Sequence, residues 1–159
     1  MSSITDLANE ARVEPATLDD LPQLVQLLNE LFEEEADFAP DETKQEAGLR
    51  MILEEPHRGR ILVVRNDHTI IGMANLLFTI STAVGGMVLL LEDVIIHPAH
   101  RGRGYGGQLL AAVEDYAKSK GIGRITLLTD KISAESQRFF QRHGFTFSHM
   151  IPMRLLLSD

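Results

Sequence analysis

The stretch HPAHRGRGYGGQLLAAVEDYAKSKG, residues 97–121, places a glycine-rich loop directly before an amphipathic run with helical spacing. Its glycines are Gly102, Gly104, Gly106 and Gly107, and its arginines are Arg101 and Arg103. Glycines let the backbone approach a ligand, a helix N-terminus offers unpaired N–H groups, and arginines add full positive charges. The stretch therefore predicts an anion-binding loop at the start of a helix, with a glycine-rich turn carrying solvated arginines as the alternative.

The segments on either side of this loop predict a mixed α/β domain. Upstream, apolar runs rich in β-branched residues are separated by turn signals and indicate an antiparallel meander. The runs cover 60–65, 69–80 and 87–96, with turns at Asn66-Asp67 and Gly85-Gly86. We further expect a strand at 11–15, a first helix that starts near Asp19 and a second helix over 41–54. After the glycine loop and its helix, we expect a strand at 124–129, a helix at 133–143, and strands near 145–149 and 152–157.

The expected order of elements is therefore βααβββαβαββ, a mixed, mostly antiparallel central sheet flanked by helices. The chain has 159 residues, of which 44% are hydrophobic and 24% charged, which is typical of one globular domain. We expect a single domain over residues 1–159, in which residues 1–10 are disordered. The absence of cysteine excludes a disulfide framework and thiolate chemistry.

Charge and hydropathy limit the classes of partner. The first residues lack the basic flank and apolar run of a secretory signal, and no apolar run approaches the roughly 20 residues that span a bilayer. We therefore expect a cytoplasmic protein without a membrane segment. The net charge of −8 argues against nucleic acid as a partner. It is compatible with a cationic small molecule, or with a charge that only maintains solubility.

The glycine loop also fits a nucleotide-binding pattern. Gly102-x-Gly104-x-x-Gly107 matches the dinucleotide fingerprint, and Asp130, at the end of the next strand, stands near the place of a ribose-binding acid. That fingerprint places its first glycine directly after a strand and opens a doubly wound sheet. Here residues 97–101 intervene, and the upstream strands form a meander. An NAD(P)-binding domain is therefore kept as an alternative.

The same residues satisfy a second pattern, Arg101-x-x-Gly104-x-Gly106, between LEDVIIHP and the later SAESQRFFQRHGF. From about residue 60 to its end, the chain resembles the GNAT superfamily of N-acetyltransferases, whose acetyl-CoA pyrophosphate loop reads [Q/R]-x-x-G-x-[G/A]. The resemblance implies direct transfer of acetyl from acetyl-CoA to the amine of a small molecule, and a homodimer. The letters LED also resemble the diamine and polyamine branch. No metal is expected, because His97 and His100 have no third ligand at diagnostic spacing.

The resemblance also implies which residues hold acetyl-CoA. The end of the strand before the loop would bind the pantetheine amides, the loop would bind the pyrophosphate, and the downstream helix would contact the cofactor. The expected residues are Val94, Ile95, Ile96, Arg101, Gly102, Arg103, Gly104, Tyr105, Gly106, Gly107, Ser133, Ser136, Phe139 and Phe140.

The reaction needs a neutral amine, whereas an alkylammonium has a pKa of about 10.4, so a base must take a proton. Glu92 is the candidate base, and strict strand alternation places it on the face of Val94 and Ile96. A β-bulge would reverse that assignment. Asp93, Glu33 and Glu34 are expected to bind a cationic acceptor, which the family places against the first two helices. The alternatives are a buried hydrogen-bonded carboxylate for Glu92 or Asp93 and a solvated helix face for the glutamates.

One position departs from the family pattern. Phe140 stands where the family has a tyrosine that protonates the departing thiolate, and a phenyl ring donates no proton. We expect Phe140 to pack against the pantetheine or the core. Ser136 and His143 are candidate substitutes, and a thiol of pKa about 8.5 also leaves without an acid. A CoA-binding sensor or interaction module with weak or no catalysis is therefore a further alternative.

Overall fold

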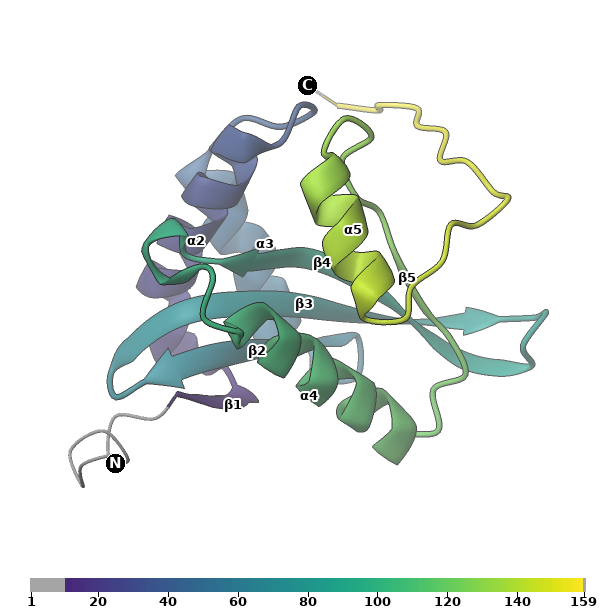
Figure 1. Ribbon diagram of the computed structural model, residues 1–159, viewed down its shortest axis with the longest axis horizontal. Helices are drawn as coiled ribbons and strands as arrows, with labels where there is room; N and C mark the ends of the chain where they lie inside the picture. The colour runs from purple at the N-terminus through teal and green to yellow at the C-terminus, as the bar shows by residue number, and fades with distance from the viewer. Residues whose placement is uncertain (1–10, 159) are drawn as a thin grey trace. The chain divides into compact units, whose positions relative to one another are not determined.

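The computed structural model describes residues 11–158, and the chain divides into two compact units, Met1–Leu128 and Thr129–Asp159 (Figure 1). The expected disorder of residues 1–10 lies outside the described residues. The expectation of one domain over the whole chain stays a prediction.

The first unit is built on a five-stranded sheet in the order β1-β2-β3-β4-β5. The strands are β1 (Arg12–Pro15), β2 (Gly59–Asn66), β3 (Thr69–Ser81), β4 (Gly86–Ile96) and β5 (Ile125–Leu127). The first three pairings are antiparallel and β4 pairs with β5 in parallel, which confirms the predicted meander and mixed sheet. Left-handed φ angles of 54° at Asp67 and 79° at Gly85 form the turns that the sequence indicates.

Helices cover both faces of this sheet (Figure 1). They are α2 (Leu21–Glu34), α3 (Glu42–Glu54) and α4 (Tyr105–Ser119), with short 3-10 turns η1 (Leu18–Asp20) and η2 (Pro98–His100). Leucines of α2 and α3 form one core with Ile61, Val63 and Met73 of the sheet. Because strand side chains alternate, the buried Leu62 and Val64 lie on the opposite face, under α4. Between residues 11 and 158, every helix is too short or too polar to cross a bilayer.

A buried ion pair sets the start of α2. Both Asp20 oxygens accept hydrogen bonds from the Arg65 guanidinium, at 3.0 and 2.8 Å, and the Thr17 N–H donates to Asp20 at 2.8 Å. Arg65 also binds Glu14 of β1. The hydrogen bonds from Arg65 hold the pKa of Asp20 below its usual range. These hydrogen bonds connect η1 with β1 and β2 at the edge of the sheet.

The second unit contains α5 (Ala134–Arg142). The Ser133 hydroxyl accepts a hydrogen bond from the Ser136 N–H at 3.3 Å and caps the helix, as its sequence position predicts. Gly144, with φ of 94°, follows the last turn. The Phe140 ring packs edge-on against Phe139 and Phe145, with centroid distances of 5.2 and 5.8 Å.

The two strands expected near 145–149 and 152–157 are wrong for the described residues, because no strand follows α5 up to residue 158. Apolar residues in this segment fit strand spacing, but a strand forms only where a neighbouring strand bonds its N–H and C=O groups. Among residues 11–158 this segment pairs with no strand, and its side chains stay exposed, 83% for Ile151 and 90% for Leu157. The described order therefore ends at α5.

Candidate active site

A β-bulge interrupts β4 at its acidic pair. Glu92 lies opposite Asn75 of β3 and Ile95 lies opposite Met73, so two residues of β4 face one residue of β3 between these pairs. Asp93 has φ of 53°, in the left-handed region that aspartate tolerates better than most residues. The bulge places Glu92 on the face of Ile95, and Ile96 on the other face. The face that strict alternation predicts for Glu92 is therefore wrong, because β4 contains the β-bulge that would reverse this assignment.

A groove of about 600 Å³ lies on the Glu92 side of the sheet, between β3, β4, α2 and α3. We call it the β4 groove. Asn75, Glu92 and Asp93 line it from the sheet, and we call these three residues its acidic corner. Its apolar walls include Leu28, Phe32, Leu49, Ile52 and Leu77. The groove thus combines a corner of carboxylate and amide oxygens with space for an apolar body.

Asp93 is the electrostatically perturbed residue of this corner. Its Oδ2 accepts a hydrogen bond of 2.6 Å from Nδ2 of Asn75. Burial raises the pKa of Asp93 to about 6, the bond from Asn75 opposes the rise, and the charge of Glu92 adds to it. Perturbed carboxylates in clefts are typical of functional sites. At pH 7 the corner therefore holds a mostly ionised Asp93 beside Glu92, an arrangement that attracts a cation.

Arg101 connects the glycine loop to α2. Its Nη2 donates to both oxygens of Glu34, at 2.9 and 3.1 Å, and its Nε donates to the Ile96 carbonyl at 2.9 Å. Glu33 is exposed on the same helix, and neither glutamate lines the β4 groove. The structure therefore brings together Arg101, which is predicted to bind acetyl-CoA, and Glu34, which is predicted to bind the cationic acceptor. Their expected binding roles stay predictions.

The glycine loop has the conformation that an anion site needs. Gly102 and Gly104 have φ angles of 79° and 85°, and Gly104 immediately precedes α4. A side chain added at either glycine would meet no atom within 4 Å, so the space beside the loop is open. The first N–H groups of α4 have no intrahelical acceptor, and its first turn carries no acidic residue. The loop can therefore present donors to a phosphate.

The pairing of β5 with β4 ends before β4 reaches this loop. Their pairing covers only Leu89–Leu91 with Ile125–Leu127. Beyond Leu91, this edge of β4 has no strand partner within the described part of the chain, whereas His97 still bonds Ile71 on the β3 side at 2.7 Å. An extended ligand with amide groups can therefore pair with the free edge of β4 and reach the loop with its phosphates.

Residues 21–145 match the model of the Acetyltransferase (GNAT) family. The chain belongs to the GNAT acetyltransferase family. It is an acetyl-CoA-dependent N-acetyltransferase with a mixed α/β fold, as the sequence resemblance predicts. Its membership argues against the alternative of an NAD(P)-binding domain, and the antiparallel meander does so independently.

Related proteins support this assignment. The chain is 30% identical to the uncharacterized N-acetyltransferase YhfO of Bacillus subtilis, covering 72% of this chain and 78% of that protein. It is 27% identical to the aminoalkylphosphonate N-acetyltransferase of Salmonella typhimurium, covering 84% of each. A crystal structure of a possible acetyltransferase from Clostridium difficile 630 shares the fold, with a TM-score of 0.84, 14% identity, and coverage of 94% of this chain and 99% of that chain.

The other residues that the GNAT pattern implies lie in the second unit. Ser133 and Ser136 are joined by a hydrogen bond of 3.0 Å between their hydroxyls. Phe139 packs against Phe140 and against His143, whose ring centroid is 4.9 Å away. The structure brings these residues together with one another. Their contacts with the cofactor stay predictions.

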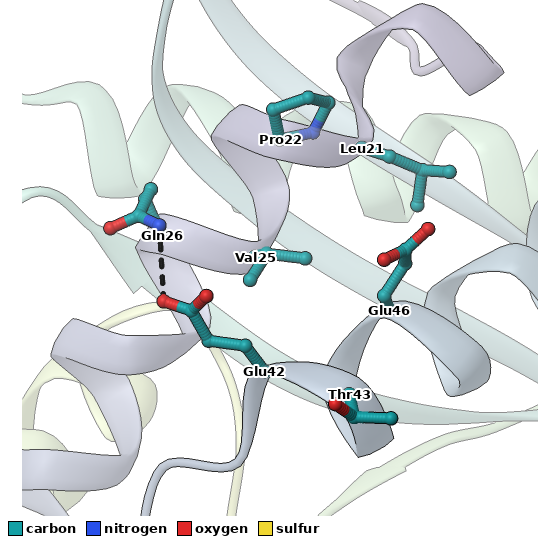
Figure 2. A pocket seen from close by; sticks show the side chains of 7 residues that line it. All are labelled: Leu21, Pro22, Val25, Gln26, Glu42, Thr43 and Glu46. Carbon is teal, nitrogen blue, oxygen red and sulfur yellow. Dashed lines mark hydrogen bonds between the residues drawn. The ribbon is translucent and has the colours of Figure 1, made fainter.

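A second, smaller hollow of about 380 Å³ lies between α2 and α3 (Figure 2). Gln26 there donates a hydrogen bond to Glu42 at 3.3 Å, and Val25 contributes an apolar wall. None of the residues that the GNAT pattern implies lines this hollow. Across residues 11–158, no three His, Cys, Asp or Glu side chains come close enough to hold a metal ion. The β4 groove is therefore the candidate active site of the GNAT fold.

Asn75 is the site residue that the sequence interpretation missed. It is 3% exposed and stands within the otherwise apolar segment GMANLLF of β3. An asparagine is uncommon at a fully buried position, because its amide needs hydrogen-bond partners. The signal available in the sequence was this one polar residue within an apolar strand.

Proposed function

We propose that this enzyme transfers the acetyl group of acetyl-CoA directly to a primary amine of a small, cationic acceptor bound in the β4 groove. The observation that carries the proposal is the acidic corner, in which Glu92 and Asp93 stand beside the free edge of β4. A carboxylate pair at this place attracts an ammonium ion and accepts the proton that the amine must lose before attack.

The residues of the first unit fit acetyl-CoA. The backbone of Val94 and Ile96 would bind the pantetheine amides, and the N–H groups from Gly102 to Gly107 would bind the pyrophosphate. The Ile96 carbonyl already accepts from Arg101, so the Ile96 N–H is the group proposed for this role. The thioester supplies an activated acetyl group and a thiolate as leaving group.

Glu92 is the proposed general base, acting directly or through water, and Asp93 is the proposed ligand of the ammonium. Both line the groove, and Asp93 has the left-handed φ of the bulge. Asp93 is held by Asn75, whereas Glu92 makes no hydrogen bond that would fix its carboxylate among the described residues. A base that is free to approach the amine suits proton transfer.

The proposed acceptor is a small amine. The net charge of −8 and the carboxylates of the groove favour a cation. The related Salmonella protein is named for an aminoalkylphosphonate, which is also a small primary amine. A cytoplasmic location and a homodimer are proposed with this function, and sedimentation of the purified protein tests the dimer.

A free-thiol release screen tests the function. The purified chain is mixed with acetyl-CoA and with 2-phenylethylamine, spermidine, 2-aminoethylphosphonate, an aminoglycoside, amino acids and a lysine peptide. We expect thiol release that depends on the amine, and an acetylated product of matching mass.

A different result separates the alternatives. Stabilisation by CoA in a thermal shift assay, without thiol release on any amine, would favour a sensor or interaction module instead. Stabilisation by NAD or NADP and not by CoA would favour the dinucleotide pattern of the loop.

A further inference from the structure

Asn75 of β3 is a buried amide with only one of its two ends satisfied. Its Nδ2 donates to Asp93 at 2.6 Å, but its Oδ1 has no hydrogen-bond partner among residues 11–158. The side chain is 3% exposed and lines the β4 groove. Buried side-chain acceptors in native proteins are as a rule paired, so an unpaired one calls for a donor.

The orientation of this amide is determined by its neighbour. An ionised carboxylate only accepts hydrogen bonds, so the NH₂ group of Asn75 must face Asp93 and its carbonyl must point elsewhere. The cross-strand partner, Glu92, is also a carboxylate and cannot donate when ionised. The donor for Oδ1 must therefore come from outside the acidic corner.

The acidic corner holds acceptor oxygens of three neighbouring residues, two carboxylates and one amide. Asn75 and Glu92 are directly opposite residues of neighbouring strands, whose Cβ atoms stand about 5 Å apart, and Asp93 bonds to Asn75. A primary ammonium carries three N–H donors and no acceptor, as a lysine head group does. It can satisfy one oxygen of each residue at once, whereas a secondary amine has one donor fewer.

We propose that the side-chain carbonyl of Asn75 accepts a hydrogen bond from the acceptor amine and thereby selects primary over secondary amines. This inference rests on the proposed function. Asn75 then has two tasks, with its NH₂ group holding Asp93 in place and its carbonyl binding the nitrogen that is to be acetylated.

The experiment compares two probes on wild type and variants. The probes are 2-phenylethylamine, whose apolar body matches the walls of the groove, and N-methyl-2-phenylethylamine, its secondary analogue. The measured quantities are kcat/KM for each amine, KM for acetyl-CoA, and binding of each amine by calorimetry in the presence of CoA. Binding is included because it does not require turnover.

Asn75→Leu removes both ends of the amide and keeps a side chain that branches at the same atom. We expect the KM for 2-phenylethylamine to rise about tenfold or more, because a hydrogen bond to a charged group is lost. The preference for the primary probe over the secondary one should shrink by a similar factor. The KM for acetyl-CoA should stay within about twofold. A general loss of structure would not change a ratio between two amines.

Asn75→Asp separates the two tasks and serves where Asn75→Leu folds poorly. Two adjacent carboxylates share a proton, so the introduced carboxyl group and Asp93 keep a hydrogen bond between them, and one oxygen stays available to the amine. We expect this variant to keep the primary preference within about threefold of wild type. Gln23→Leu is the matched control, since Gln23 also bonds through both ends of its amide, to His68 and Ile70, outside the groove. It should leave both the preference and the amine KM unchanged.

Three results would overturn the inference. They are an unchanged amine KM in Asn75→Leu, an equal loss of the primary preference in Asn75→Leu and Asn75→Asp, and no calorimetric binding of 2-phenylethylamine to wild type. If wild type binds this amine through Asn75 but acetylates none of the amines in the screen, the proposed function fails and the inference about binding stands.

Discussion

Two aspartates of the first unit, Asp20 and Asp93, are each held by a neighbouring side chain, with opposite electrostatic results. Asp20 pairs with the Arg65 guanidinium, and this positive partner lowers its pKa. Asp93 is bonded by the neutral amide of Asn75 and lies beside Glu92, and burial raises its pKa to about 6. A carboxylate with a cationic partner is satisfied within the fold, whereas Asp93 forms no ion pair within residues 11–158.

The difference separates a cluster whose charges are paired within the fold from a cluster that has the features of a ligand site. The Asp20 cluster joins η1, β1 and β2 and supports the start of α2. The acidic corner lines a groove and carries a left-handed residue and an unpaired amide oxygen. Such perturbed features are typical of functional sites. The proposed ammonium supplies the positive charge in the groove that Arg65 supplies to Asp20.

The largest expected effect on stability is at the satisfied pair. Arg65→Met should lower the free energy of unfolding by about 2 kcal/mol, because it leaves the buried Asp20 without its cation. Urea denaturation measures this. Arg50→Met is the control, since Arg50 forms only exposed pairs along α3 and should change stability little. Equal effects of the two variants would contradict the special role assigned to the Asp20 cluster.

A smaller effect of opposite sign is expected at Asp93. Its raised pKa means that the folded state favours the protonated form, so its stabilising contribution is complete below about pH 4 and is lost as the pH rises to about 6. Asp93→Asn keeps an acceptor for Asn75 and tolerates the left-handed φ. A rise of about two in the pKa corresponds to roughly 3 kcal/mol. Asp93 is partly open to the groove, where solvent screens much of this, so the variant should be about 1 kcal/mol more stable than wild type at pH 7.5 and about equal near pH 4.

The same variant should bind the acceptor amine more weakly, since the charge that attracts it is gone. Chemical denaturation at the two pH values and the amine KM provide the measurements. Asp115→Asn on the exposed side of α4 is the control. A variant that is less stable than wild type at pH 7.5 would show that Asp93 is satisfied in the fold, like Asp20.

The smallest effect, on kcat, is expected at Phe140, whose side chain carries no titratable group. Phe140→Tyr introduces a phenol at the position where the GNAT pattern has a proton donor. A several-fold rise in kcat would show that the missing acid limits turnover. No change would support departure of the unassisted thiolate, and this is the result we expect, because a thiol of pKa about 8.5 is a fairly good leaving group. Phe145→Tyr, which alters the ring next to Phe140, is the control.

The sequence predicted those features that depend on neighbouring residues. The meander follows from alternating apolar runs and glycine turns, and the loop follows from Gly102 and Gly104, whose left-handed φ angles the structure contains. Even the departure from strict alternation was recognised as an option at Glu92. That option could not be decided from one strand, because a bulge depends on how many residues of the partner strand face it.

Features that join distant segments were not predicted. Arg101 and Glu34, which form an ion pair, are 67 positions apart in the sequence. The role of Asn75 depends on its hydrogen bond to Asp93 on the next strand. The expected strands at 145–149 and 152–157 failed for the same reason, since apolar spacing describes one chain segment and pairing needs a second one. Local chemistry was therefore readable from sequence, and contacts between elements required the structure.

The pH dependence of kcat/KM in Glu92→Gln tests the central claim most directly, namely that the acidic corner takes the proton of the acceptor amine. The account predicts a rate about 100-fold lower than wild type at pH 7, because a positioned general base is lost. Part of the rate should return near pH 10, where the amine is already neutral. A rate within threefold of wild type with an unchanged pH profile would contradict the claim.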